Sequence, residues 1–197
     1  MLTLVKKIVI YATNTLDLWY NRFIMNHKKV EFVSFPKING RIFITGGGKL
    51  KLGDNVAFNS GKYSNPIGGD TRMTISVAKG ALLEIDDFAG ISNTAIICHE
   101  KMNIGKHVKI GGNVKIYDTD FHSLDPLLRS NSETDRGNTR PVKIGDFCFI
   151  GAHSIILKGV VIGDNSIIGA GSVVTKSIPE NEIWAGNPAK FIKKLTS

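Results

Sequence analysis

The sequence predicts an all-β protein wound as a parallel β-helix of triangular coils, and its six-residue period is the main observation that favours this fold. Between Ile144 and Ile178 an aliphatic residue opens each block of six: Ile144, Ile150, Ile156, Ile162, Ile168 and Val174. Gly usually follows the opening residue, and a small or aliphatic residue stands four positions after it. The same period runs upstream at Ile85, Ile91 and Ile97 and, after a slip of one residue, at Ile104, Ile110 and Ile116.

A period of six matches neither a helix, whose apolar face returns every three to four residues, nor an ordinary strand, which alternates every two. Six residues make a short strand and a tight corner, where Gly, Asn and Asp accept a positive φ. Three such units close a coil of about eighteen residues, and stacked coils share one aliphatic core. An unrelated β-sandwich is the alternative, but its turn signals would come at longer spacing.

The N-terminal segment, residues 1–35, is expected to be helical over residues 1–26. One line of residues follows helical spacing there: Leu4, Ile8, Tyr11, Thr15, Leu18 and Arg22, flanked by Val5, Val9, Leu16 and Trp19. Asp17 is the one acidic residue in residues 1–29. The basic residues there are Lys6, Lys7, Arg22, Lys28 and Lys29. Two interpretations stay open. The helix packs on the end of the β-helix or on a sister subunit, or it makes a peripheral contact with an anionic membrane.

The β-helical domain is expected over residues 36–189, with an excursion loop at 123–140 and a basic tail at 190–197. The stretch from Pro36 to Leu52 forms an atypical first turn, as terminal repeats usually do. The six-residue register breaks after His122 and resumes near Pro141, so the polar segment between them must leave the coil. Long loops on rigid scaffolds often carry function.

Composition narrows the class of protein. The 197 residues are 42% hydrophobic and 21% charged, with a formal net charge of +8, which indicates a folded globular chain with a solvated basic surface or an anionic partner. No nucleic-acid module is present, so nucleic acid is not expected as a partner. Two cysteines, Cys98 and Cys148, make no disulfide framework or metal motif. We expect a cytoplasmic protein without a signal peptide or membrane-spanning helix.

His122 is the sharpest candidate for chemistry. It stands six positions after Ile116, where an aliphatic residue is due, at the mouth of the excursion loop. A titratable imidazole at the edge of a coil, beside a long loop, is well placed to act as a general base. The alternative is a histidine that fills a corner with both ring nitrogens satisfied.

Three stretches resemble the hexapeptide acyltransferases, particularly the galactoside, maltose and nodulation acetyltransferase branch. They are His122-Ser123-Leu124-Asp125-Pro126, Ile162-Gly163-Asp164-Asn165-Ser166 through Val174-Thr175-Lys176, and Ala185-Gly186-Asn187-Pro188-Ala189-Lys190. The resemblance is closest from Val142 to Leu195 and does not clearly extend to residues 1–40. It implies a left-handed parallel β-helix, a homotrimer, and acyl-CoA sites in the clefts between subunits.

The resemblance also implies roles for particular residues. His122 falls on the family's catalytic base, although Ser123 replaces the commoner Pro, and Asp120 or a backbone carbonyl would orient the imidazole. Asn93 falls on an Asn that lines the acceptor site, or is simply a corner Asn with positive φ. The residues implied for acyl-CoA binding are Gly151, Ala152, Ala170, Thr175, Lys176, Lys190 and Lys193. Trp184 would pack near the adenine or cap the last coil.

The expected function is an acetyl-CoA-dependent O-acetyltransferase that needs no metal and acts on a sugar hydroxyl, in a surface polysaccharide or its precursor. A membrane-touching helix would place it at the inner face of the membrane. Two other classes stay open. The solenoid could be a non-catalytic scaffold. Alternatively, His99, His107 and His153 could converge between subunits on zinc, as in the β-helical carbonic anhydrases.

Overall fold

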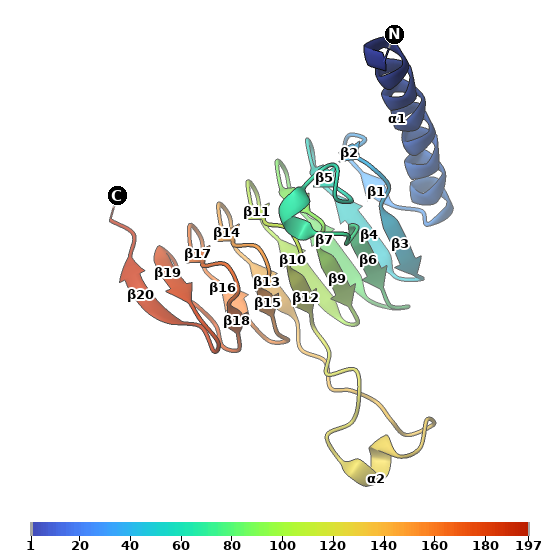
Figure 1. Cartoon of the computed structure of the whole chain (residues 1–197). Coiled ribbons are helices and arrows are strands. Elements are labelled where there is room, and N and C mark those ends of the chain that lie inside the picture. The colour runs from blue at the N-terminus through green and yellow to red at the C-terminus, as the bar shows by residue number, and fades with distance from the viewer. Residues whose placement is uncertain (1, 197) are drawn as a thin grey trace.

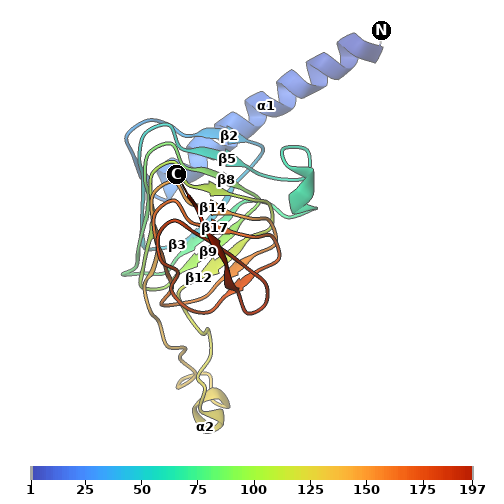
Figure 2. The same cartoon turned by 90° about the vertical axis from the view of Figure 1, so that its left-hand side faces the viewer.

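A three-sided prism of parallel strands forms the body of the protein (Figures 1 and 2). The computed structural model describes the backbone of residues 2–196 and the side chains of residue 13 and residues 15–196. Helix α1 (Leu2–His27) lies at the N-terminal end of the prism, and an arm carrying the short helix α2 (Pro126–Arg129) leaves its middle. The all-β prism, the N-terminal helix and the excursion confirm the predicted fold class.

Each side of the prism is one sheet, and we call the sides faces A, B and C in the order in which the chain visits them. Face A holds β1 (Glu31–Phe32), β4 (Lys49–Leu52), β7 (Leu82–Ile85), β10 (Lys101–Ile104), β13 (Val142–Ile144) and β16 (Val161–Ile162). Face B holds β2 (Lys37–Asn39), β5 (Ala57–Asn59), β8 (Gly90–Ser92), β11 (Lys109–Ile110), β14 (Phe149–Ile150), β17 (Ile167–Ile168), β19 (Glu182–Ala185) and β20 (Lys190–Lys194). Face C holds β3 (Phe43–Gly46), β6 (Thr74–Val77), β9 (Ala95–Cys98), β12 (Lys115–Tyr117), β15 (Ile155–Ile156) and β18 (Val173–Val174).

The six-residue period is the register of the core. Ile144 pairs with Ile162, Ile150 with Ile168, and Ile156 with Val174, in parallel on faces A, B and C. All six side chains are at most 1% exposed, so they stack as ladders inside the prism. The residues four positions later also point inward, and the serines among them are satisfied: the Ser166 hydroxyl donates to the Pro179 carbonyl at 2.7 Å.

Left-handed backbone at the corners explains the residues that follow each ladder position. Between faces A and B, positive φ occurs at Asn55, Phe88, His107, Phe147, Asn165 and Asn181. At this corner the carboxylates of Asp87, Asp146 and Asp164 each accept a backbone N–H of the preceding coil. The Asp164 carboxylate, for example, accepts the Asp146 backbone N–H at 2.9 Å. A Cβ at Gly145 would lie 2.2 Å from Asp164 Oδ1, so this corner requires glycine.

Helix α1 closes the N-terminal end of the prism through its last turns. The Asn21 amide donates to the Gly40 carbonyl at 2.8 Å and accepts the Ile42 N–H at 3.2 Å, and Met25 is fully buried. The expected apolar stripe does not make this contact, because Leu18 is 45% exposed and Arg22 is exposed. Three other members of that stripe, Leu4, Ile8 and Tyr11, lie outside the described side chains. Within the described residues, no helix has the length and hydropathy needed to cross a bilayer.

The C-terminal end is closed by a hairpin. Strand β19 continues face B in parallel with β17, and β20 then returns antiparallel to β19. Trp184, 9% exposed, packs edge-on against Phe191, and its indole N–H donates to the Glu182 carboxylate at 2.7 Å. These contacts fit a cap on the last coil, and packing of Trp184 near the adenine stays a prediction.

Candidate active site

The arm, which we define as residues 119–139, leaves the prism at the corner between faces C and A. Its stem is a short antiparallel ladder: the Asp120 N–H donates to the Asn138 carbonyl at 3.0 Å, and the Arg140 N–H to the Asp118 carbonyl at 2.9 Å. Fully buried Asp118 holds the root, because its carboxylate accepts the backbone N–H groups of His99, Glu100 and Lys101 at 2.6–3.0 Å. The arm therefore starts from a fixed point (Figure 1).

His122 and Asp135 form a hydrogen-bonded pair across this arm. His122 Nδ1 lies 2.6 Å from Asp135 Oδ2, and the other oxygen of Asp135 accepts the Ser123 N–H at 2.7 Å. The hydrogen bond with His122, followed by that from Ser123, lowers the pKa of the Asp135 carboxyl below its ordinary value. The charged carboxylate fixes the N–H on Nδ1, which leaves Nε2 as the basic nitrogen of a side chain that is 69% exposed.

The orienting residue for His122 is therefore neither of the two expected ones. The Asp120 side chain lies 3.0 Å from Lys158 Nζ, an ion pair without hydrogen-bond alignment, and both groups are largely buried. The Asp120 backbone carbonyl accepts the His122 N–H at 2.8 Å, which fixes the backbone and not the imidazole. The sequence does not predict the pairing of Asp135 with His122, because Asp135 comes thirteen residues later in a stretch with no periodicity.

His122 also lies closer to the surface than the sequence pattern predicted. It does not fill the ladder position six after Ile116, since the chain has already left the coil at Asp118. Beside it stands a small aromatic cluster: the Phe121 ring lies 5.4 Å from Tyr117 and 6.0 Å from His99. Phe121 has a φ of 64°, a left-handed conformation that is uncommon for a bulky residue, and it turns the chain immediately before His122.

Asn93 occupies a different corner, between faces B and C, and its side chain is already used. It is 1% exposed with a φ of 44°. Its carbonyl oxygen accepts the Gly61 N–H at 2.8 Å, and its amide donates to the Asn65 carbonyl at 2.9 Å. These bonds anchor the loop that carries the 3-10 turn η1 (Pro66–Gly68). The corner interpretation of Asn93 thus accounts for what it does within one chain.

The residues implied for CoA binding fall on two corners. Gly151, Ala152 and Ala170 lie at the corner between faces B and C, where a Cβ on Gly151 would meet the Ala170 nitrogen at 2.5 Å. Thr175 and Lys176 are exposed at the corner between faces C and A, the corner from which the arm leaves. Face C separates the two groups, so one copy of the chain does not bring them together.

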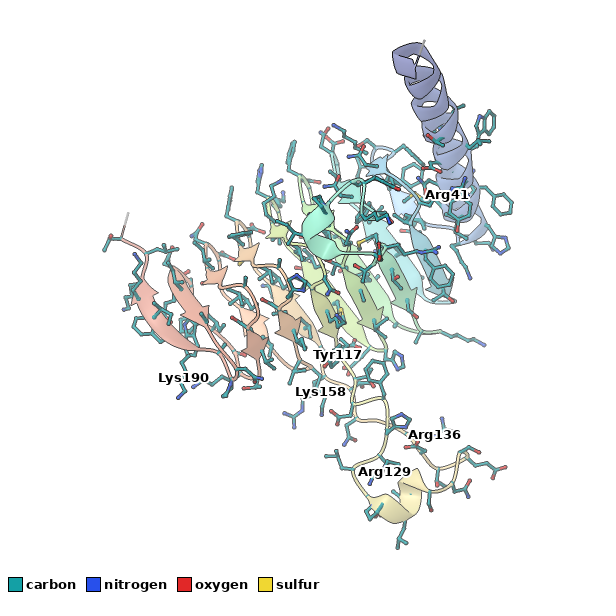
Figure 3. All side chains as sticks on the ribbon, in the orientation of Figure 1. Arg41, Tyr117, Arg129, Arg136, Lys158 and Lys190 are labelled. Atoms are coloured by element: carbon teal, nitrogen blue, oxygen red, sulfur yellow. The ribbon has the colours of Figure 1, made fainter. Side chains whose placement is uncertain are left out.

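Basic side chains occur at both of these corners. Lys158, like Lys176, follows a strand of face C, whereas Lys190 lies opposite Ala185 at the end of β19, towards the corner between faces B and C. Figure 3 shows Arg129 and Arg136 on the arm. Lys176 Nζ lies 5.2 Å from the centre of the Trp184 ring, a cation–π contact, and Lys190 and Lys193 are exposed on β20.

The remaining histidines and the cysteines have local contacts of their own. His107 is stacked between Phe88 and Phe147 at 4.8 Å, and His153 contacts the Asn113 amide at 3.0 Å and the Ile67 carbonyl at 3.1 Å. Among the described residues, no group of three potential metal ligands occurs. Burial raises the pKa of the Cys98 thiol to about 12 and that of Cys148 to about 11, so neither is a nucleophile at neutral pH.

Comparison with known sequences identifies the repeat. The family described as hexapeptide repeat of succinyl-transferase matches residues 141–176. Galactoside O-acetyltransferase of Escherichia coli (strain K12) is 42% identical over 103 residues, 52% of this chain and 49% of that protein. WbbJ of the same strain, provisionally named as a lipopolysaccharide biosynthesis O-acetyl transferase, is 29% identical over 85% of this chain and 81% of its own. The chain spans about half the length of the first curated relatives that it matches.

Solved structures share the architecture. A maltose O-acetyltransferase from Clostridium difficile 630 has a TM-score of 0.56 at 28% identity, covering 95% of this chain and 86% of that one. A hexapeptide-repeat acetyltransferase from Vibrio cholerae, complexed with acetyl coenzyme A, has a TM-score of 0.58 at 21% identity and covers 94% and 86%. Residues 141–176 thus match the hexapeptide repeat, and the fold is the left-handed parallel β-helix that the resemblance implied, shared with these hexapeptide-repeat acetyltransferases.

Proposed function

We propose that the protein is an acetyl-CoA-dependent O-acetyltransferase that transfers the acetyl group to a sugar hydroxyl. The observation that carries this proposal is the His122–Asp135 pair, an oriented imidazole on an exposed side chain, in a protein that shares the repeat and the fold of the hexapeptide acyltransferases. The names of the galactoside and maltose relatives support a sugar acceptor, and that of WbbJ supports a surface polysaccharide or its precursor.

The chemistry follows from the state of the imidazole. His122 Nε2 takes the proton of the acceptor hydroxyl as the oxygen attacks the thioester carbonyl carbon. The resulting imidazolium is stabilised by the Asp135 carboxylate on its other nitrogen, and it returns the proton to the sulfur as the C–S bond breaks. Products are the acetate ester and CoA thiol. Binding both substrates beside one imidazole supplies much of the rate through proximity.

The donor site is proposed to need two copies of the chain. One copy would offer the corner with Gly151, Ala152 and Ala170, and another the corner with Thr175, Lys176 and the arm. The tip of the arm supports such an assembly, because Leu124 and Leu127 are 73% and 81% exposed on a segment that projects from the prism (Figure 2). A homotrimer, as the family resemblance implies, would bury these leucines and form a groove at each interface. Lys190 and Lys193 would attract the CoA phosphates.

The deciding experiment measures CoA release from acetyl-CoA with a panel of sugars, and identifies each product by mass spectrometry. We expect acceptor-dependent thiol release that accompanies a 42-dalton gain on the sugar, roughly the mass of an acetyl group replacing a hydrogen. Purified protein that binds acetyl-CoA but acetylates none of a broad glycan panel would favour a non-catalytic scaffold. A requirement for stoichiometric zinc would favour the metal-dependent alternative.

A further inference from the structure

Helix α1 presents an unpartnered apolar stripe on the side opposite the prism. Leu16, Trp19 and Phe23 are spaced by three and four residues, so they share one side of the helix. Their side chains are 59%, 70% and 66% exposed. Asn21 and Met25, which contact the prism, stand on the opposite side by the same helical spacing. The stripe therefore faces away from the body of its own chain.

The stripe belongs to a helix that extends past the prism. In Figures 1 and 2, the N-terminal part of α1 projects beyond the end of the prism, and large side chains on its outer side point away from the body in Figure 3. In the sequence, Val5, Val9 and Ala12 continue the line of Leu16 at the same three- and four-residue spacing. A helix with such an apolar side is stable when something covers it.

The net charge of the N-terminal segment indicates which kind of surface covers the stripe. Residues 1–29 contain five basic side chains and one acidic one, 5 − 1 = +4, and that acid, Asp17, is already paired with Arg41 at 2.6 Å. A second copy of the helix would bring the same positive charges together. A surface of phosphate headgroups over hydrocarbon matches both the charge and the stripe, and an exposed Trp is a residue type that settles at that boundary.

We propose that α1 binds the surface of an anionic lipid bilayer through Leu16, Trp19 and Phe23, lying in the interface without crossing it. Attraction to the headgroups comes from the excess of basic residues in this segment, including exposed Arg22 and exposed Lys29 just after the helix. The proposal goes beyond acetyl transfer, and vesicle binding is measured without acetyl-CoA or acceptor, so the two proposals fail separately.

Vesicle flotation of the full-length protein tests it. We expect co-flotation with phosphatidylcholine vesicles containing about 30% phosphatidylglycerol, weak binding to phosphatidylcholine alone, and loss of binding at high salt. The two tryptophans give a second readout. Trp19 is 70% exposed and Trp184 is 9% exposed, so a blue shift of the emission on adding vesicles reports burial of Trp19.

Replacing Trp19 and Phe23 together by Ser is expected to lower the vesicle partition coefficient at least about tenfold, because two aromatic anchors are lost. The control replaces Phe147 and Phe149, 58% and 48% exposed on the prism, by Ser, and should bind as the parent does. A parent protein that stays with the unbound fraction, or a Trp19/Phe23 variant that floats unchanged, overturns the proposal. A variant that instead loses subunits in light scattering would assign the stripe to a second copy.

Discussion

The prism and the arm are built on opposite principles. From Ile144 to Ile178 every coil repeats the same buried positions, and each ladder residue is held by the coils above and below it. The arm has no stacked aliphatic core: its leucines are exposed, and its shape depends on the buried carboxylate of Asp118 and on the pair of His122 with Asp135. Stability thus resides in the repeat, and the proposed chemistry in the departure from it.

The largest effect expected is on the prism, where Ile168→Ala would break a ladder. Ile168 is fully buried between Ile150 and the last coil, so its truncation should lower the free energy of unfolding by about 3 kcal/mol. Its neighbour Ile167 points outward on the same strand and is partly exposed. Ile167→Ala should cost less than about 1 kcal/mol. Urea unfolding of both variants at one protein concentration makes the measurement, and equal losses would contradict a ladder core.

On the arm, His122→Ala should remove activity and leave stability almost unchanged. We expect turnover to fall by a factor on the order of a hundred or more, with CoA binding retained, because the lost group acts on the proton and not on the donor. His107→Asn is the matched control. It removes an imidazole from the corner between faces A and B, and it places there a residue type that other coils use at a similar φ. Retained turnover in His122→Ala would refute the proposed base.

The difference between the repeating prism and the irregular arm also explains which features the sequence could predict. The ladders and the corners follow from a period of six, because each depends on neighbours at fixed spacing. The same period predicted that the arm leaves after His122, whereas the chain leaves the coil after Asp118. His122 was found through its place at the break and through a motif. Asp135 could not be found in this way, because its approach to His122 depends on how the arm folds back, through the contacts of Asn138 and Asp120. The apolar stripe that α1 exposes also differs from the predicted one. It runs through Leu16, Trp19 and Phe23, whereas the predicted line ran through Leu18 and Arg22 with Leu16 and Trp19 beside it.

Asp135→Asn tests whether the arm positions its base. The amide keeps the shape but loses the charge that stabilises the imidazolium, so we expect kcat to fall roughly tenfold with the KM for acetyl-CoA unchanged. Glu133→Gln removes the same charge from an exposed position of the arm and should leave kcat nearly unchanged.

The lowered pKa of Asp135 fixes the pH window of that test. A carboxyl whose pKa is depressed in the folded protein contributes stability above its unfolded value, about 3.9, and loses it as the pH falls through the lowered pKa. Asp135 is therefore charged at neutral pH, where the turnover of Asp135→Asn is measured. Unchanged turnover of Asp135→Asn at neutral pH would show that the carboxylate does not position His122.

The smallest effect is expected at the C-terminal hairpin, which closes the end of the prism. Lys190→Glu with Lys193→Glu should raise the KM for acetyl-CoA about fivefold and leave kcat nearly unchanged, because exposed lysines contribute point charges that salt screens. Lys37→Glu with Lys49→Glu makes an equal charge change on exposed strands at the other end of the prism. If both pairs raise KM equally, net charge and not a phosphate site attracts the donor, and the two regions would share no binding surface. If only the hairpin pair does so, and the difference disappears at high salt, the last coil of the prism supplies the donor site that the arm's imidazole needs.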